Sequence, residues 1–318
     1  MTIDLNTTYN MDCLEGLRGL GDCSIDCCVT SPPYFALRDY GCDGQIGLEG
    51  SPEEYIEKLT VVFAEVLRVM KPEGTCWVNM GDTYAGAGKG AANYPENAKK
   101  YKQGTNVGTL DKATSYKFVT EAKDRDLIGV PWMMAFALRR IGFYLRQDII
   151  WHKPNPMPEP VKSRCVKSHE YIFLLSKSRT YYFDSEAIKE RAVTAGKRWE
   201  IGSRQRGLFV PGQKYEQFRG GYYCQNEMAN KRDVWTIALK PTKNTIHHST
   251  YPEELPMLCI LAGCPVGGIV LDPFMGVGTT AMAALKLGKK FIGFELNTNY
   301  CDLANKRVAD FQKQLRLF

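Results

Sequence analysis

Four consecutive residues, Ser31, Pro32, Pro33 and Tyr34, carry the sharpest chemical signal in the sequence. The Ser31 hydroxyl and the Pro32 carbonyl are two oxygens that can accept both hydrogens of an amino group on a nucleobase. Holding these hydrogens takes the nitrogen lone pair out of conjugation with the ring and makes it able to attack a methyl group. Prolines have no N–H to compete and keep the loop rigid. The structural alternative is a Pro-Pro turn that only ends a strand.

Tyr34 adds an aromatic ring to the same loop. Chemistry on a base inside a duplex requires the base to be flipped out of the stack, where an aromatic ring can stack on it. The loop is therefore suited to a flipped base.

A glycine-rich loop near the C-terminus is the second candidate site. Asp272 opens the run Asp-Pro-Phe-Met-Gly-Val-Gly-Thr-Thr, which follows the apolar residues 269–271. Gly276 and Gly278 let the backbone turn tightly and approach a ligand closely, and Thr279 or the next threonine can cap the following helix. Glu295 lies 17 residues after Gly278, at the end of the next expected strand, where a carboxylate can accept hydrogen bonds from ribose hydroxyls.

Three interpretations of this glycine loop remain open when it is considered alone. Gly276, Gly278 and Ala281 fit the spacing of a dinucleotide-binding loop, but the acid Asp272 would repel a pyrophosphate. A methyl donor with a sulfonium and an amino group suits that acid better. The third interpretation is a tight turn with a glycine pair and no ligand.

The elements that must position these loops alternate between strand and helix, which predicts a parallel α/β sheet. Two prolines stop the first buried strand, and Ser51 followed by Pro52 is a good helix start. The patterns predict strands over 24–30, 75–80, 144–151, 170–176, 268–271 and 290–295, and helices over 51–70, 131–141, 252–262, 279–287 and 299–314. In such sheets, function lies at the carboxyl ends of the strands.

Two irregular basic inserts interrupt this rhythm, at 85–125 and 187–245. The second contains 12 Lys and Arg against 5 Asp and Glu, interspersed with aromatic residues. That mixture suits a surface that meets phosphates and bases, and a solvated basic face is an equal alternative. The composition of 89–125 also suggests the hypothesis that this segment orders only on DNA.

Whole-chain properties exclude several classes of protein. The 318 residues carry a net charge of +6 and include no apolar run of 18 or more, so no transmembrane helix is expected. The N-terminal residues lack the features of a signal peptide, which predicts a cytoplasmic protein. The 11 cysteines show no Cys-x-x-Cys spacing, so we expect free thiols and no metal.

The two loops together make the chain resemble the bacterial and phage DNA amino-methyltransferases, the N4-cytosine and N6-adenine family. The Thr-Ser-Pro-Pro-Tyr loop precedes the Asp-Pro-Phe-x-Gly-x-Gly-Thr-Thr loop, which resembles the family's β arrangement. The resemblance implies a Rossmann-like, S-adenosylmethionine-dependent methyltransferase sheet, α/β with helices on both faces and inserted DNA-recognition segments. It implies a catalytic core of 1–186 and 246–318, with target recognition in 187–245.

The resemblance also assigns roles to individual residues. Ser31, Pro32, Pro33 and Tyr34 would hold the target base. The residues implied for the methyl donor are Asp12, Cys13, Thr30, Asp272, Phe274, Gly276, Gly278, Thr279 and Glu295. His152 and His247 lie in further segments that resemble the family, and a structural role for both is favoured.

The reaction that the resemblance implies is direct methyl transfer, without a covalent intermediate. No Pro-Cys pair occurs, which argues against methylation of cytosine carbon 5. Thr30 followed by Ser31 favours cytosine N4, and adenine N6 is the alternative.

The expected partners are double-stranded DNA, a second copy of the chain and a cognate restriction endonuclease, with no membrane. An RNA or protein amide methyltransferase, a non-catalytic DNA-binding protein and a nicotinamide oxidoreductase are the rival classes.

Overall fold

The computed structural model describes residues 3–85, 120–159, 161–193, 195, 198–200, 215–218, 221–224, 227–239 and 251–315. The chain divides into two compact units. Unit 1 comprises Met1–Tyr182 and Val234–Phe318, and unit 2 comprises Phe183–Asp233.

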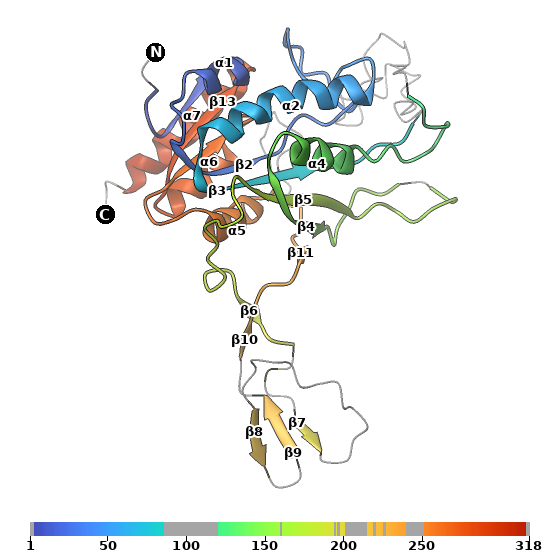
Figure 1. The fold of residues 1–318 in the computed structure, drawn as a ribbon, viewed down its shortest axis with the longest axis vertical. Helices are drawn as coiled ribbons and strands as arrows, with labels where there is room; N and C mark the ends of the chain where they lie inside the picture. The colour runs from blue at the N-terminus through green and yellow to red at the C-terminus, as the bar shows by residue number, and fades with distance from the viewer. Residues whose placement is uncertain are drawn as a thin grey trace. The chain divides into compact units, whose positions relative to one another are not determined.

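Unit 1 is built on one eight-stranded sheet with the order β1-β13-β12-β2-β3-β5-β4-β11 (Figure 1). Its strands are β1 (Thr7–Asn10), β2 (Ile25–Thr30), β3 (Met70–Met80), β4 (Tyr144–His152), β5 (His169–Ser176), β11 (Val234–Thr236), β12 (Ile269–Asp272) and β13 (Lys290–Glu295). All neighbours are parallel except β5, which runs antiparallel to β3 and β4. The carboxyl ends of the parallel strands therefore meet at one edge, together with the amino end of β5.

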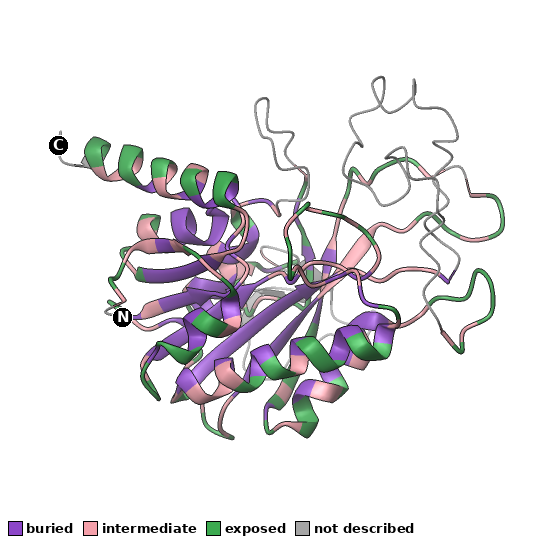
Figure 2. Ribbon diagram, turned by 90° about the horizontal axis from the view of Figure 1, so that it is seen from above, coloured by how far each residue is buried: buried purple, intermediate pink, exposed green. Residues whose placement is uncertain are grey.

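Helices cover both faces of this sheet (Figure 1). One face is covered by α1 (Cys13–Arg18), α2 (Pro52–Val69) and α4 (Val130–Arg140), and the other by α5 (Glu254–Gly263), α6 (Thr279–Lys286) and α7 (Thr298–Leu315). Figure 2 shows buried strands between helices whose outer sides are exposed. The predicted Rossmann-like α/β class is confirmed.

Helix α2 forms where the sequence predicted it. The Ser51 hydroxyl accepts a 3.1 Å hydrogen bond from the Glu54 backbone N–H, and Pro52 occupies the first turn. Its buried face carries Tyr55, Leu59 and Phe63, which pack into the core between this helix layer and the sheet. The helical spacing of apolar residues was therefore sufficient to place α2.

Strand β3 begins earlier than predicted, at Met70 rather than Thr75. Its pairing with β2 shifts register between Met70 and Thr75, so residues 71–74 form a bulge. A bulge tolerates Pro72, which cannot donate a ladder hydrogen bond. Lys71 anchors this segment to β2 through a 2.7 Å ion pair with Asp26.

The first two elements of the chain, β1 and α1, were not predicted. β1 pairs in parallel with β13 at the edge of the sheet. Asp12 ends the connection between β1 and α1, and its carboxylate accepts hydrogen bonds from the backbone N–H groups of Leu14 and Glu15. A strand of four residues and a helix of six are too short for a hydrophobic period to reveal them.

The segment predicted to be irregular, 187–245, contains strands. In unit 2, β6 (Glu190–Arg191) pairs with β10 (Met228–Ala229), and β7 (Arg198–Glu200), β9 (Gly221–Cys224) and β8 (Tyr215–Phe218) form a second antiparallel sheet. Aromatic residues favour strands, and they are frequent here. β11 pairs with β4, so the chain returns to unit 1 at Val234.

The ends of the other insert are held together. The Ala85 N–H donates a 2.8 Å hydrogen bond to the Asp126 carbonyl, and the Arg125 N–H donates one of 2.9 Å back to Ala85. Residues 86–119 lie outside the described residues. The hypothesis that 89–125 orders only on DNA falls mostly on them and stays a prediction. Among the helices that the structure describes, none combines the length and apolarity that a membrane crossing demands.

Candidate active site

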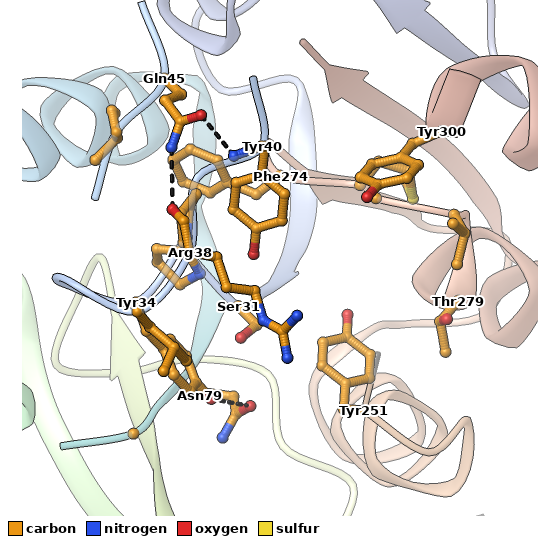
Figure 3. A pocket seen from close by; sticks show the side chains of 18 of the residues that line it. Ser31, Tyr34, Arg38, Tyr40, Gln45, Asn79, Tyr251, Phe274, Thr279 and Tyr300 are labelled. Atoms are coloured by element: carbon orange, nitrogen blue, oxygen red, sulfur yellow. Dashed lines mark hydrogen bonds between the residues drawn. The ribbon is translucent and has the colours of Figure 1, made fainter. Parts of the chain in front are cut away.

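A cavity of about 530 Å³ opens at the edge of the sheet where the parallel strands end (Figure 3). Most of the predicted site residues line it: Asp12, Cys13, Ser31, Pro32, Pro33, Tyr34, Phe274, Gly276, Thr279 and Glu295. Thr30, Asp272 and Gly278 do not line it. The structure thus brings the two loops, more than two hundred residues apart in the sequence, onto one cavity.

The cavity lies where the chain direction across the sheet reverses. After β2 the chain continues to β3, and after β12 it continues in the opposite direction to β13. The connections therefore separate between β2 and β12 and leave a crevice at the carboxyl ends of the strands. Thr30 ends β2 and Asp272 ends β12, and the Thr30 hydroxyl donates a 2.6 Å hydrogen bond to Asp272.

Asp272 does not line the cavity, although the sequence suggested that its carboxylate would face the cations of a methyl donor. It is buried and accepts hydrogen bonds from the Thr30 and Thr280 hydroxyls, the Phe274 N–H and the Tyr251 hydroxyl. Burial raises the pKa of this carboxyl, and its hydrogen bonds oppose that shift. Asp272 therefore joins the two loops from behind the cavity wall.

The expected threonine cap of α6 is wrong. Gly278 occupies the N-cap position, and no side chain caps the helix. Thr280 uses its hydroxyl for Asp272 instead. Gly278 has φ +82°, and a Cβ atom there would lie 2.9 Å from the Ala304 Cβ in α7. This position therefore requires glycine for both its backbone conformation and its close packing.

Glu295 is held at the opposite side of the glycine loop. Its Oε2 accepts a 2.7 Å hydrogen bond from the Gly276 N–H, and its Oε1 accepts one of 2.8 Å from the Asn297 N–H. Each carboxylate oxygen retains capacity for another donor. Burial raises the pKa of Glu295, and both backbone bonds oppose that shift. The side chain is thus fixed where a ligand hydroxyl could donate to it.

Buried groups fix the Ser-Pro-Pro-Tyr loop. The hydroxyl of Tyr55, a buried residue of α2, donates a 2.8 Å hydrogen bond to the Pro33 carbonyl. The Ser31 side chain lines the cavity beside Tyr34 (Figure 3). The Pro33 carbonyl is thus fixed by α2, and all four residues of the loop line the cavity.

Tyr34 is anchored by its hydroxyl, which lies 2.7 Å from Glu170 Oε2 and 3.1 Å from Asn79 Oδ1. The other oxygen of Glu170 forms an ion pair with Lys153. Burial is the largest cause that raises the pKa of Tyr34, and the Glu170 charge adds to it, so the phenol keeps its proton. Gly81 leaves room for the ring, because a Cβ atom there would lie 2.6 Å from Tyr34 Cε2.

Sequence reasoning missed several residues that line the cavity. They are Arg38, Tyr40, Asn79, Glu170, Asn297 and Tyr300. Asn79 and Asn297 lie at or just beyond strand ends, a signal that could have identified them. Glu170 is the second residue of the antiparallel strand β5 and carries no such signal. His152 bonds to Thr236 through Nδ1 at 3.2 Å, and His247 lies outside the described residues.

The described cysteines are all free, and most are buried. Burial raises the pKa of the Cys13 thiol to about 12, so this cavity residue stays neutral. In the described part of the chain, no group of three or more His, Cys, Asp or Glu side chains is placed to hold a metal ion.

Fold and site together define a Rossmann-like α/β protein with its cavity at the switch point of the sheet. The chain belongs to the DNA methylase family, whose N6_N4_Mtase model matches residues 25–306. This result confirms the family resemblance that the two loops indicated.

Individual relatives agree with the family. The Type II methyltransferase M.SmaI of Serratia marcescens is 41% identical over 299 residues, which cover 93% of this chain and 88% of that protein. M.Cfr9I of Citrobacter freundii, also a Type II methyltransferase, is 38% identical over 96% of this chain and 89% of its own length.

Two solved structures share the fold. The cytosine-N4-specific PvuII DNA methyltransferase superposes with a TM-score of 0.61 at 17% identity, over 96% of this chain and 92% of that one. The complex of M1.HpyAVI with SAM gives a TM-score of 0.53 at 18% identity, over 95% and 98% of the two chains.

Proposed function

We propose that this DNA methylase transfers a methyl group from S-adenosylmethionine to the N4 amino group of a cytosine flipped out of double-stranded DNA. The observation that carries this proposal is the single cavity onto which the Ser31–Tyr34 loop and the Gly276–Glu295 side both open. A donor bound at one side and a base at the other would meet inside it.

The donor side fits S-adenosylmethionine, which supplies a sulfonium-activated methyl group when bound. Glu295 offers a carboxylate for the ribose hydroxyls, and Asp12 adds a second acid for a cationic ligand. Cys13, Phe274, Gly276 and Thr279 complete this wall. Thr30, Asp272 and Gly278 would support donor binding indirectly, because they shape the two loops from behind the wall.

Ser31, Pro32 and Tyr34 would act on the base. The Ser31 hydroxyl oxygen and the Pro32 carbonyl accept the two amino hydrogens, which frees the nitrogen lone pair for attack. The Tyr34 ring stacks on the flipped base. Most of the acceleration comes from aligning the nitrogen with the methyl group, and the amino proton is then lost to water.

The choice of cytosine rests on Thr30 followed by Ser31 at the start of the loop. Adenine-N6 enzymes more often carry Asp at the serine position, where the carboxylate accepts hydrogen bonds more strongly. The cytosine-N4 specificity in the name of the PvuII enzyme agrees with this choice at the level of the fold.

We assign target recognition to unit 2 and expect a cognate restriction endonuclease, as the Type II names of the relatives suggest. Within unit 2, Glu190 forms ion pairs with Lys231 and Arg232, which reduces the charge they offer to DNA. The sequence places Arg204 and Arg206 among the basic residues of this segment, and they serve as the probes of this role. Substituting both with Gln should weaken DNA binding and flatten its salt dependence, with donor affinity unchanged.

The deciding experiment measures methylated nucleosides in genomic DNA from cells that express the wild-type chain or Ser31→Ala. N4-methylcytosine that is absent with the variant supports the proposal. N6-methyladenine retains the mechanism and overturns the choice of base. Neither product from a folded, donor-binding wild-type protein overturns the proposal in favour of an RNA or protein substrate.

A further inference from the structure

A lysine side chain reaches the side of the cavity that is proposed to hold the base. Lys167 lines the cavity, and its Nζ donates a 2.6 Å hydrogen bond to the Asp82 carbonyl. Asp82 directly follows Gly81, where an added Cβ atom would lie 2.6 Å from Tyr34 Cε2. The residue that holds the Lys167 ammonium is therefore the neighbour of the residue against which the Tyr34 ring packs.

Two acids that lie near Lys167 are bound to other groups. The Asp82 carboxylate accepts two 3.0 Å hydrogen bonds from backbone N–H groups at the start of α4. Glu159 forms a 2.9 Å ion pair with Arg164. The contact of Lys167 with Asp82 is thus made to a neutral carbonyl and not to the carboxylate.

The other lysine of the cavity, Lys153, has a different role. Its ammonium forms an ion pair with Glu170, which in turn accepts the hydrogen bond of the Tyr34 hydroxyl. The same ammonium lies 4.3 Å from the centroid of the Trp151 ring. Lys153 therefore supports the wall behind Tyr34, whereas Lys167 retains donors for a ligand.

Those donors can be counted. An ammonium carries three N–H groups, and among the residues that the structure describes Lys167 uses one of them, for the Asp82 carbonyl. Burial lowers the pKa of Lys167, and the charge of Asp82 opposes that shift. A half-buried ammonium has lost part of its hydration, so an oxygen supplied by a ligand would restore a lost hydrogen bond.

The charge of the cavity wall favours a neutral oxygen over a phosphate. The lining acids are Asp12, Asp82, Glu159, Glu170 and Glu295, and the lining Lys and Arg residues are Arg38, Lys153 and Lys167. A phosphate inside this acid-rich wall would be repelled by several carboxylates. A carbonyl oxygen of a neutral base meets no such repulsion.

We infer that Lys167 donates a hydrogen bond to the O2 carbonyl oxygen of the flipped cytosine. This inference rests on the proposed function. Ser31 and Pro32 would hold the amino group at carbon 4, and Lys167 binds the other end of the same base edge. Adenine carries a C–H at the corresponding place and would leave the buried ammonium without an acceptor. Lys167 thus selects cytosine over adenine.

Single-turnover methylation of two duplexes tests the inference. Both carry the recognition site mapped from methylated genomic DNA, and they differ only in the target base, which is cytosine or 2-thiocytosine. The sulfur of 2-thiocytosine replaces O2 and accepts hydrogen bonds weakly. The wild-type protein should methylate the thio duplex about 10- to 100-fold more slowly at subsaturating DNA.

The variants complete a cycle with these two duplexes. Lys167→Met should slow methylation of cytosine by a similar factor, and replacing O2 by sulfur should then cost little more. Lys167→Arg keeps a charged donor and should recover part of the rate on cytosine. Lys290→Met, at an exposed position where β13 begins, is the matched control and should behave as the wild type on both duplexes.

Other outcomes overturn the inference. If Lys167→Met slows both duplexes by the same factor, the side chain only supports the Asp82 carbonyl. The same result with a smaller salt dependence of DNA binding would make a DNA phosphate its partner. If the wild-type protein methylates adenine instead, the proposed choice of base fails and the inference with it. If it methylates cytosine and Lys167→Met is as fast as the wild type, the inference alone fails.

Discussion

The Thr30 hydroxyl donates a 2.6 Å hydrogen bond to the Asp272 carboxylate across the junction of β2 and β12. Thr30 immediately precedes the loop proposed to hold the base, and Asp272 opens the glycine loop proposed for the donor. Because Asp272 also accepts the Phe274 N–H, one buried carboxylate sets the exit direction of both loops. The separation between the two halves of the cavity thus depends on this carboxylate.

Asp272→Asn should destabilise the protein. An asparagine offers one oxygen and places an amide donor against the hydroxyls that now donate to Asp272. The unsatisfied groups should lower the free energy of unfolding by about 2–3 kcal/mol, measured by urea denaturation. Asp310→Asn, at an exposed position of α7, is the control and should have no effect. Wild-type stability of Asp272→Asn would contradict this role.

Donor affinity should depend on pH through Glu295. Burial raises the pKa of this carboxyl above its ordinary value of 4.5, and ribose hydroxyls donate to the ionised form. The association constant should therefore rise with pH up to the raised pKa and level off above it, with a slope of at most about one proton. Titration calorimetry across this range measures it.

Glu295→Gln is the control for that pH dependence. It should bind the donor more weakly and show a flatter profile. Burial also raises the pKa of Asp272, but that residue is present in both proteins, so the difference between their profiles isolates Glu295. A profile that keeps its slope in Glu295→Gln would assign the titration to another group.

A pair of glycines separates backbone strain from crowding. Gly278 and Gly267 have φ +82° and +70°, but only Gly278 has a neighbour within 4 Å of an added Cβ, Ala304. Gly267→Ala should cost about 1–2 kcal/mol of unfolding free energy, the left-handed penalty alone. Gly278→Ala should cost more and also weaken donor binding, because the glycine loop must shift away from α7. Equal costs would show that the packing against Ala304 relaxes freely.

The sequence predicted most of unit 1 because its long elements have clear hydrophobic periods. The residue types in the two loops also predicted which segments line the cavity. The orientation of Asp272 could not be predicted, because its partner Thr30 is 242 residues away and the bond exists only once β2 and β12 are neighbours. The same holds for Tyr34 and Glu170: Tyr34 follows β2, Glu170 lies in β5, and both strands pair with β3.

Arg38 shows a different limit of sequence reasoning. A single arginine after the Ser-Pro-Pro-Tyr loop looks like any surface cation in the sequence. In the fold, Gln45 fixes the backbone on both sides of Asp39, directly after Arg38. Only the folded arrangement shows that this cation lines an otherwise acid-rich cavity.

The Tyr34 hydroxyl should position the ring that stacks on the base. Tyr34→Phe keeps the ring but removes the proton that Glu170 and Asn79 accept, so the ring gains freedom. We expect a several-fold loss of kcat with little change in donor affinity, whereas Tyr34→Ala should lose far more. Single-turnover methylation and the fluorescence of 2-aminopurine at the target position measure chemistry and base flipping separately.

A double-mutant cycle with Glu170→Gln completes this test. If Glu170 acts through the Tyr34 hydroxyl, its substitution should cost less in the Tyr34→Phe background than in the wild type. Glu170→Gln also leaves Lys153 without its ion-pair partner, so part of the single-variant effect should persist in the double variant. Tyr144→Phe, at an exposed position of β4, controls for loss of a hydroxyl. Full additivity of the two substitutions would show that Glu170 does not position Tyr34.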